Sequence, residues 1–545
     1  MKIVIVGGVA GGASAAARAR RLSESAEIVL FERGQYVSFA NCGMPYYVGD
    51  EIKVRDKLIV TTPERLRERF KINVQPGCNV VEIDRAQKQV VVQRAGSNEL
   101  FIQPYDKLVL SPGASPFLPP IPGMDSPNVA TLRTLDDVDR IRARVDSGID
   151  HVVVVGAGFI GLEMVENLVH RNIKVTLVEL ADQVLPVMDR EMTTPILAEL
   201  KSKGVAVHLN TTVSEIQNNQ DRVILHLSTG STIDCGLVLF GVGVRPENKL
   251  AGDSGLATGP RGGIVTNSFM QTSDPDIYAV GDAVETEDYV LKTRTQVPLA
   301  GPANRQGRLA VDHIFGRKVR FRGTQATAIV KAFNTVVAST GASEKVLKRE
   351  ARSYQKIYLH PANHAGYYPG AQAMSIKLLF DQNDGKILGA QITGGEGVDK
   401  RIDVLSMAIQ AGMTVFDLEE SELAYAPQFG SAKDPINMAG FIASGVVRKD
   451  HPIIHVDQLL QVAAPYLIDV RTEDEHRLGT IPGSKLIPVD QLRDRLDEIP
   501  SSSDVIVFCQ VGQRGYIATR ILQQRGFKVQ NLSGGFKAYR LFHPA

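Results

Sequence analysis

Short apolar runs alternate with glycine-containing turns and amphipathic stretches along much of the chain. Each apolar run is bounded by turn residues and is of the length expected for a buried parallel strand. A strand, a glycine turn, a helix and a second strand occur in this order twice, so the pattern predicts two Rossmann-like domains in an α/β fold. The predicted strands are 2–6, 27–31, 151–155 and 174–178, and the predicted helices run from Ala13 to Leu22 and onward from Leu162.

Each of these units carries a glycine turn and, after its second strand, an acidic residue. Glycines let the backbone approach a pyrophosphate, the helix N-terminus adds partial positive charge, and the acid accepts a hydrogen bond from a ribose hydroxyl. The second acid would repel a 2′-phosphate, which favours NADH over NADPH. The turns are Gly7-Gly8-Val9-Ala10-Gly11-Gly12 with Glu32, where Val9 replaces the usual second glycine, and Gly156-Ala157-Gly158-Phe159-Ile160-Gly161 with Glu179.

Composition and charge narrow the class of protein. The chain has 545 residues, 43% hydrophobic and 22% charged, with a net charge of +1. The length predicts three or four domains, and the charge gives no sign of nucleic-acid or membrane binding. The first apolar run ends in glycines and no run is long enough to cross a bilayer, so we expect a cytoplasmic protein.

The four cysteines are scattered, without the spacing of a disulfide framework or a metal site. Cys42 stands in the segment 38–46 with no second cysteine near it, so an internal dithiol is excluded. A redox thiol of this kind must react with a small-molecule thiol, a sulfane sulfur or an oxygen held as sulfenate. Cys78 and Cys235, the latter at a predicted strand start, are interpreted as structural.

A polar segment ending in proline, residues 447–452, marks a boundary before a compact α/β pattern. Cys509 ends an apolar strand and opens the loop Cys509-Gln510-Val511-Gly512-Gln513-Arg514, with a helix predicted from Tyr516. Converging backbone N–H groups, a helix dipole and Arg514 would all stabilise a thiolate or persulfide anion. Cys509 is therefore a candidate sulfur carrier.

The segments 272–282, 111–114 and 241–246 resemble the second flavin motif and the crossovers of the two-dinucleotide-domain flavoprotein oxidoreductases. The resemblance covers about the first 450 residues, and it implies FAD at the first glycine turn, with Asp282 holding the ribityl chain. It places further cofactor-binding positions at Arg33, Asn41, Ala114, Gly243, Gly281, Pro298, Leu299 and Ala300.

Within that superfamily, the segments 38–46, 364–370 and 424–427 resemble the coenzyme A-disulfide reductase branch. The resemblance implies catalytic roles for Tyr367 and Tyr425, which would reach the partner subunit's active site in a homodimer. Arg18 and Arg21, at i and i+3, are expected to share a helix face that suits phosphate groups. A family member used for comparison has glutamine where this chain has Arg18 and histidine where it has Asn304. The lysine that binds coenzyme A in the family lies one residue away from the position of Lys71. The implied coenzyme A contacts are Ser14, Arg18, Arg21, Ser38, Asn41, Cys42, Lys71, Asn304 and Lys433.

The C-terminal region resembles a rhodanese domain, through its Asp-Val-Arg strand, Ile-Pro-Gly turn and Cys-x-x-Gly-x-Arg loop. Two further domains are expected after the Rossmann-like pair. The first is an α+β dimerisation domain, with an antiparallel sheet and helices on one face. The second is a C-terminal α/β rhodanese domain. The expected limits are 1–112 and 245–322 for the FAD domain, 113–244 for the NAD domain, 323–448 for dimerisation and 455–545 for the rhodanese domain.

These features together predict an NADH-dependent flavoprotein that reduces coenzyme A persulfide or polysulfide, and coenzyme A disulfide, through Cys42. Sulfide and thiol would be the products, and Cys509 would load or relay sulfane sulfur. Three alternatives stay open: an NADH oxidase or peroxidase that uses a sulfenate, a sulfurtransferase with an accessory reductase, and a flavin redox sensor that docks a partner.

Overall fold

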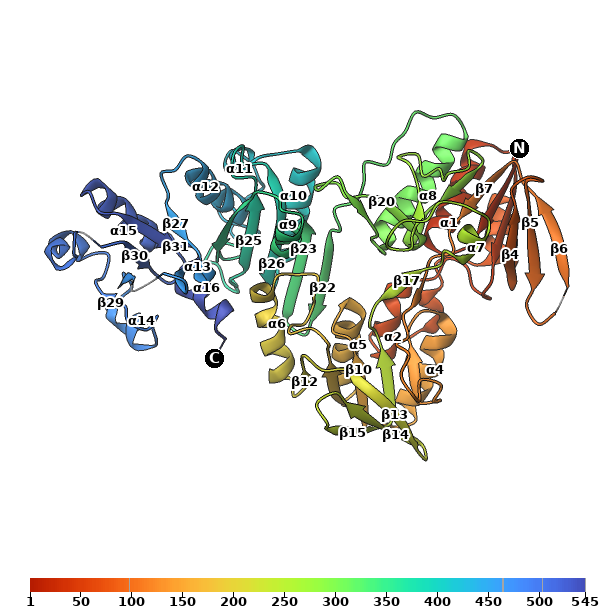
Figure 1. Cartoon of the computed structure of the whole chain (residues 1–545), viewed down its shortest axis with the longest axis horizontal. Coiled ribbons are helices and arrows are strands. Elements are labelled where there is room, and N and C mark those ends of the chain that lie inside the picture. Colours follow the sequence, from red (N-terminus) through yellow and green to blue (C-terminus); the bar gives the residue numbers. More distant parts are fainter. Residues whose placement is uncertain (98, 463–464, 502, 545) are drawn as a thin grey trace. The chain divides into compact units, whose positions relative to one another are not determined.

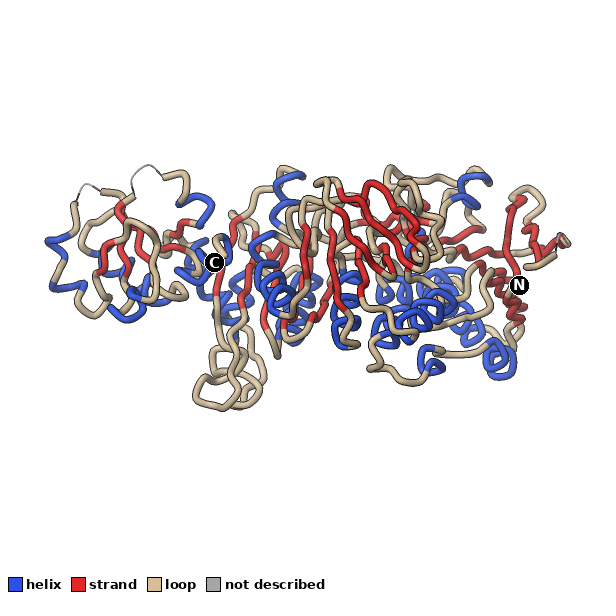
Figure 2. Tube along the Cα trace, turned by 90° about the horizontal axis from the view of Figure 1, so that it is seen from below, coloured by secondary structure: helices blue, strands red, loops and turns tan. Residues whose placement is uncertain are grey.

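The computed structural model describes residues 1–97, 99–462, 465–501 and 503–544, and it is mixed α/β throughout (Figures 1 and 2). The chain divides into two compact units. The first comprises Met1–Asp182 and Lys203–Ala326, and the second comprises Gln183–Ser202 and Thr327–Ala545. In the part of the chain that the structure describes, no helix is long and apolar enough to span a membrane.

The first sheet of the first unit has five parallel strands in the order β19-β7-β1-β2-β3. Helix α1 (Ala10–Leu22) packs against α8 (Ala300–Ile314). Helix α1 begins at Ala10 rather than at the predicted Ala13, because residues of the glycine turn enter its first helical turn. The strands are β1 (Lys2–Val6), β2 (Glu27–Glu32), β3 (Asn73–Pro76), β7 (Lys107–Leu110) and β19 (Ile277–Ala279).

The second sheet of this unit is also five-stranded and parallel, in the order β12-β11-β10-β16-β9. Two doubly wound sheets of this kind confirm the predicted Rossmann-like pair. Helix α5 (Phe159–His170) starts three residues before the predicted Leu162, directly after extended Gly158. The strands are β9 (Val129–Thr131), β10 (His151–Val155), β11 (Lys174–Val178), β12 (Ala206–His208) and β16 (Leu237–Phe240).

Beside it lies an antiparallel sheet of β13 (Val213–Asn219), β14 (Arg222–Leu227) and β15 (Thr232–Cys235). The segment around Cys235 does contain a strand start, at Thr232, and Cys235 is the last residue of that strand, β15, with Gly236 separating it from β16. The side chain is fully buried, in keeping with the structural interpretation of this cysteine.

The second unit contains an antiparallel sheet in the order β22-β23-β26-β25-β24, which confirms the predicted sheet type. Helices α6 (Arg190–Ser202), α10 (Val398–Ala411) and α12 (Pro435–Val447) pack against its strands. The strands are β22 (Ala328–Ala332), β23 (Thr335–Gly341), β24 (Gln355–Leu359), β25 (Ser375–Phe380) and β26 (Ile387–Gly394).

The same unit ends in a parallel sheet with the order β27-β31-β30-β28-β29. Helix α15 (Gln513–Gln524) begins before the predicted Tyr516, because Gly512 takes a positive φ of 99° and ends the preceding turn. The strands are β27 (Ile453–Ile454), β28 (Tyr466–Asp469), β29 (Lys485–Leu486), β30 (Val505–Phe508) and β31 (Val529–Leu532).

A buried ionic cluster joins the parts of the second unit. The fully buried Lys377 ammonium contacts Asp189 at 2.9 Å and both Glu191 and Glu344 at 2.6 Å. The three carboxylates are spaced as metal ligands would be, but the lysine ammonium already lies among them. Lys356 bridges Glu344, at 2.9 Å, and Asp457 of the C-terminal part, at 3.0 Å. Further bonds run from Tyr358 N to Ser533 Oγ and from Thr194 Oγ1 to the Leu541 carbonyl.

Candidate functional site

The first glycine turn is packed too closely for side chains at two of its glycines. A Cβ on Gly7, whose φ is +94°, would lie 2.0 Å from the Ser111 carbonyl oxygen. A Cβ on Gly12 would lie 1.8 Å from the Gly7 carbonyl oxygen. These glycines therefore allow the strand, the turn and the helix to come together, as a dinucleotide fold requires.

The second turn presents open backbone at its central glycine. A Cβ on Gly158 would meet no atom within 4 Å, and this residue directly precedes α5. A pyrophosphate could approach this backbone and the helix N-terminus together. Phe159 and Ile160 form the first residues of that helix. The residues present thus fit a dinucleotide.

Both predicted acids lie beside their turns. Glu32 Oε2 accepts a hydrogen bond from Gly8 N at 2.7 Å, and Glu179 Oε2 accepts one from Ala157 N at 2.6 Å. Glu32 ends β2 and Glu179 directly follows β11, and each of these strands pairs with the strand that leads into the glycine turn, so the sheet fixes the acid where a ribose would lie.

The second flavin motif meets the first glycine turn. A Cβ on Gly11 would lie 2.9 Å from Ser111 Oγ and 3.0 Å from Val280. Gly281, with φ of +83°, donates its N–H to Gln306 Oε1 of α8 at 2.8 Å. Segments far apart in sequence therefore converge at the start of α1, which fits a long cofactor such as FAD.

The remaining predicted flavin positions lie around this convergence or at the crossovers of the first unit. Burial raises the pKa of Asp282, while the positive charge of Arg133 opposes the rise. Arg33 pairs with Glu247 at 3.2 Å, and Asn41 donates to the Arg133 carbonyl at 3.2 Å. Ala114 begins β8 (Ala114–Pro116), Gly243 precedes β17 (Val244–Pro246), which pairs with β8, and Pro298-Leu299-Ala300 leads into α8.

Cys42 lies in the short 3-10 turn Asn41–Gly43, directly before α2 (Met44–Val48). The thiol is free and the residue is exposed. The protein packed around the thiol raises the pKa of Cys42, and the carboxylates of Glu163 and Asp282 raise it further. The free thiol of Cys42 therefore experiences the negative charge of two carboxylates.

The second thiol site is the loop that begins at Cys509, a residue only 1% exposed. Its Sγ accepts a hydrogen bond from Gly512 N at 3.2 Å, as expected of a loop with converging N–H groups. Arg514 forms a two-point ion pair with Glu475, at 2.6 and 2.7 Å. This hydrogen-bonded pair raises the pKa of Arg514 and holds that of Glu475 at about 2. The loop therefore offers a backbone donor to an anionic sulfur, but the positive charge of Arg514 is paired with the Glu475 carboxylate.

Tyr367 and Tyr425 lie together in the second unit. Their hydroxyl oxygens are 2.9 Å apart, and the residues are 77% and 49% exposed. The bond to Tyr425 raises the pKa of Tyr367, so its hydroxyl keeps its proton at neutral pH. Two phenols on one surface form a ready proton-donating pair.

The predicted coenzyme A residues lie on several elements of the two units. Ser14 Oγ bonds to Asn304 Oδ1, which joins α1 and α8. The Arg21 guanidinium lies over the Phe70 ring, whose neighbour Lys71 ends α3 (Pro63–Phe70). Ser38, with φ of +48°, precedes Cys42 in the first unit, whereas Lys433 is exposed before α12 of the second unit.

The expectation that Arg18 and Arg21 share a phosphate-binding face is wrong. Arg18 is buried, and its guanidinium bonds the Asp312 carboxylate at 2.6 Å. The i, i+3 spacing places both on neighbouring positions, but α8 covers Arg18 and leaves Arg21 exposed. Arg20 is buried as well, bonded to the Phe70 and Lys71 carbonyls.

Several residues of these sites were not identified from the sequence. Glu163 raises the pKa of Cys42 and accepts a hydrogen bond from Tyr46, Glu475 pairs with Arg514, and Gln306 accepts a hydrogen bond from the second flavin motif. Of these residues, Glu163 alone stands near a sequence motif that could have drawn attention to it, since it follows the last glycine of the second fingerprint by two residues.

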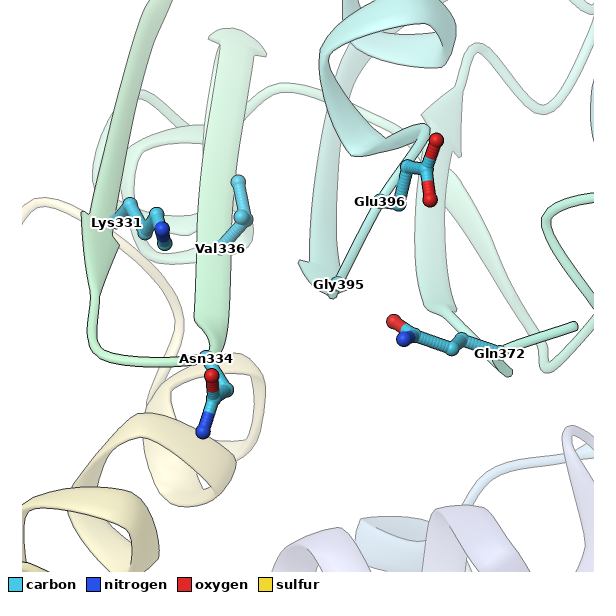
Figure 3. Close-up of a pocket in the computed structure, with 6 residues that line it drawn as sticks. All are labelled: Lys331, Asn334, Val336, Gln372, Gly395 and Glu396. Carbon is cyan, nitrogen blue, oxygen red and sulfur yellow. The ribbon is translucent and has the colours of Figure 1, made fainter. Parts of the chain in front are cut away.

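A separate hollow in the second unit is lined by none of the predicted site residues (Figure 3). Its lining is Lys331, Asn334, Val336, Gln372, Gly395 and Glu396.

Comparison with known proteins agrees with this arrangement. Residues 1–307 match the pyridine nucleotide-disulphide oxidoreductase family, 327–434 match its dimerisation domain, and 455–541 match the rhodanese-like domain. The chain is 38% identical to the coenzyme A disulfide reductase of Staphylococcus haemolyticus (strain JCSC1435) over 81% of this chain and 99% of that protein.

Two solved structures cover nearly the whole chain. The structure of reduced Bacillus anthracis CoADR-RHD shares 47% identity and a TM-score of 0.97, over 100% of this chain and 98% of that one. That of an NAD-dependent persulfide reductase from A. fulgidus shares 36% identity and a TM-score of 0.92, over 99% and 100%. The chain therefore belongs to the pyridine nucleotide-disulphide oxidoreductase family, as an oxidoreductase that also carries a rhodanese-like domain.

Proposed function

We propose that this protein is an NADH-dependent reductase of coenzyme A persulfide or polysulfide, and of coenzyme A disulfide, with Cys42 as its single redox cysteine. The observation that carries the proposal is the exposed free thiol of Cys42, in the unit that holds both dinucleotide turns. The similarity to a coenzyme A disulfide reductase and to a persulfide reductase supports this choice of substrates.

The nucleotide sites would act through the residues already described. FAD at the first turn would supply two-electron transfer between NADH and sulfur. Glu179 beside the second turn favours a free ribose 2′-hydroxyl, which supports NADH over NADPH. The proposed domain limits are 1–112 with 245–322, 113–244, 323–448 and 455–545. Residues 183–202 belong by sequence to the NAD domain, although they group with the second unit.

At the sulfur site, the Cys42 thiolate would attack the substrate disulfide or persulfide and expel a thiolate. We assign Tyr367 and Tyr425 of the partner subunit to donate a proton or hydrogen bond to that leaving group. Their shared hydrogen bond and exposure support this role, because both hydroxyls face away from their own core. The coenzyme A contacts would be Ser14, Arg21, Ser38, Asn41, Lys71, Asn304 and Lys433, whereas Arg18 would act by anchoring α1 to α8.

Cys509 would accept or relay sulfane sulfur in the rhodanese-like domain. Its bond from Gly512 N supports an anionic sulfur at this position. Coenzyme A bound as a thiol could carry sulfur between the two cysteines.

The testing experiment is anaerobic NADH oxidation with coenzyme A persulfide, coenzyme A disulfide and hydrogen peroxide in parallel. Wild type, Cys42→Ser and Cys509→Ser are compared. We expect persulfide to be reduced fastest, sulfide to appear and Cys42→Ser to be inactive. Fast peroxide turnover with idle sulfur substrates would favour sulfenate chemistry instead, and loss of activity only in Cys509→Ser would favour a sulfurtransferase.

A further inference from the structure

The two exposed tyrosines stand on separate loops of the second unit. Tyr367 lies in the loop 360–374, which connects β24 to β25. Tyr425 lies in the loop 420–434, which connects α11 (Val415–Glu419) to α12. Since their hydroxyl oxygens are 2.9 Å apart, the two loops meet at the phenols, and the geometry of the pair depends on how each loop is held.

Each loop is closed by hydrogen bonds at its base. Asn363 N donates to the Gln372 carbonyl at 2.8 Å, and Asn363 Oδ1 accepts from Gln372 N at 2.9 Å. In the other loop, Asn437 Nδ2 donates to the Ser421 carbonyl at 2.7 Å, and Asn437 Oδ1 accepts from Asp434 N at 3.2 Å. The base of each loop is therefore defined by its own bonds, and a further contact must fix one base relative to the other.

Arg401 of α10 joins the two bases. Its side chain is buried, and Nη2 donates to the Asn363 carbonyl and to Asp434 Oδ2, both at 2.8 Å. Asp434 is buried as well, and its Oδ1 accepts from Ile436 N at 3.0 Å, so the same carboxylate caps α12. Lys400 Nζ, on a half-buried side chain, lies 3.7 Å from this carboxylate. The guanidinium is thus bonded to both loops at once.

Backbone contacts between the two loops lie beside this ion pair. Ala365 N donates to the Pro427 carbonyl at 3.3 Å and to the Gly430 carbonyl at 3.0 Å. A Cβ on Gly430 would lie 3.8 Å from Arg401 Nη2 and 3.6 Å from Asp434 Oδ2. Along the chain, Ala365 and Pro427 are each two residues from a tyrosine. The ion pair therefore supports the contact from which both phenols extend.

We propose that Arg401, paired with Asp434, is the positioning residue of the tyrosine pair, fixing the two loops against each other so that the phenols stay within hydrogen-bond distance. A planar guanidinium can bind a carboxylate and a carbonyl together in one fixed geometry. Because Arg401 is buried and binds the bases of the loops, it acts through the tyrosines and not on the substrate. The inference rests on the proposed function, in which the phenols stabilise the leaving thiolate.

The first test keeps the positive charge and changes its geometry. Arg401→Lys leaves a cation opposite Asp434 but loses the fork that binds both loops. Its kcat for anaerobic NADH oxidation with coenzyme A persulfide is measured in two backgrounds, wild type and the double variant of Tyr367→Phe and Tyr425→Phe. We expect kcat to fall roughly tenfold in the wild-type background and to change little where both phenols are absent. A merely structural role would lower kcat by the same factor in both.

Two control variants separate positioning from loss of stability. Arg495→Lys changes an arginine of the same unit whose two-point ion pair with Glu498, at 2.5 and 3.0 Å, is partly exposed, and it should keep the wild-type kcat. Glu344→Gln removes a buried partner of Lys377 and Lys356, so it should lower stability and still keep kcat. Flavin reduction by NADH alone should be unchanged in every variant.

Hydrogen exchange followed by mass spectrometry tests the loops themselves, in the FAD-loaded protein and without any sulfur substrate. We expect Arg401→Lys to speed exchange roughly tenfold in the peptides that contain Ala365 and Gly430, and to leave β23 and β26 at wild-type rates. If Arg401→Lys does not fold, Asp434→Asn replaces it in both tests, because its side-chain oxygen can still cap α12 while the charge that Arg401 binds is lost.

An unchanged kcat, the same loss of kcat in both backgrounds, or wild-type exchange of both loops would overturn the proposal. Failure of the proposed function would differ, since persulfide would then stay unreduced by the wild type or its reduction would survive Cys42→Ser. The exchange rates need no turnover, so they decide the role of Arg401 in either case.

Discussion

The hydroxyl oxygens of Tyr367 and Tyr425 lie 2.9 Å apart and join two loops whose residues are separated by 58 positions. One phenol can donate to the other and the second can donate outward, so the pair presents one well-oriented O–H. A departing thiolate is stabilised by such a donor.

Replacement of either phenol should therefore slow the sulfur step. We expect Tyr367→Phe and Tyr425→Phe each to lower turnover with coenzyme A persulfide by roughly 10- to 100-fold, with the double variant little worse, since the pair acts as a unit. Anaerobic stopped-flow with NADH alone should show unchanged flavin reduction.

The neighbouring Tyr368, which is 43% exposed and has no role in this step, provides the control variant Tyr368→Phe. If Tyr367→Phe and Tyr368→Phe retain the same turnover, the proposed role of the pair is wrong.

The position of Glu179 leads to a prediction on nucleotide choice. Its carboxylate accepts from Ala157 N and Ala181 N, at 2.6 and 2.8 Å, and is thereby fixed beside the second turn. We expect Glu179→Ala to shift the ratio of kcat/KM for NADPH over NADH upward by roughly tenfold, because a like-charge contact with the 2′-phosphate is removed. Glu179→Asp should retain the preference for NADH, and steady-state kinetics with both nucleotides measures the ratio. An unchanged ratio in the alanine variant would exclude Glu179 as the discriminating group.

Much of the fold was predictable because its signals are local. The strands Lys2–Val6, His151–Val155 and Lys174–Val178 end where the sequence predicts, since each apolar run meets a glycine or a polar residue. The helices after the glycine loops begin three residues earlier than predicted, at Ala10, Phe159 and Gln513. In each case residues of the loop itself enter the first helical turn, which depends on the backbone of a glycine rather than on hydrophobic periodicity.

The candidate sites were predictable only in part, because ion partners are distant in sequence. Asp312 is 294 residues from Arg18, and Glu475 is 39 residues from Arg514. Helical spacing reports which residues share a face, but not whether another helix covers that face. The phosphate-binding face that Arg18 and Arg21 were expected to share was therefore predicted wrongly, whereas local hydrogen bonds such as that from Gly512 N to Cys509 follow from the loop itself.

The ion pair of Arg18 and Asp312 predicts a stability effect rather than a binding effect. Both side chains are about one-tenth exposed, at 11% and 10%. Removing the guanidinium leaves a buried carboxylate whose remaining cation, among the residues that the structure describes, is Arg317 at 3.7 Å. We expect Arg18→Ala to destabilise the first unit by about 3–5 kcal/mol.

Exposed Arg21 gives the contrasting variant Arg21→Ala. This variant should change the free energy of unfolding by less than about 1 kcal/mol and should raise the KM for coenzyme A substrates. Denaturant unfolding followed by flavin fluorescence, together with steady-state kinetics, measures both effects. Equal unfolding midpoints for the two variants would contradict the prediction.

The buried cluster around Lys377 predicts how the second unit responds to acid. Although burial alone would raise the pKa of Glu344, the ammonium groups of Lys377 and Lys356 hold it well below its usual range. Folding lowers the pKa of this carboxyl, so its ionised form stabilises the folded protein at pH values above the unfolded-state pKa of about 4.3. That stabilisation is lost as the pH falls from there toward the pKa of the folded state. Stability of the second unit should therefore decrease below about pH 4.

Glu344→Gln tests this pH dependence because it removes the titrating group and takes one carboxylate partner from each of Lys377, Lys356 and Lys348. We expect this variant to be about 3–5 kcal/mol less stable at pH 7 and to lose less further stability between neutral and acidic pH than wild type does. Asp504→Asn removes an exposed carboxylate paired with Lys528 and should leave both quantities unchanged. Thermal unfolding followed by near-ultraviolet circular dichroism across this pH range distinguishes the two. A Glu344→Gln protein with the wild-type acid dependence would show that Glu344 does not control the acid response.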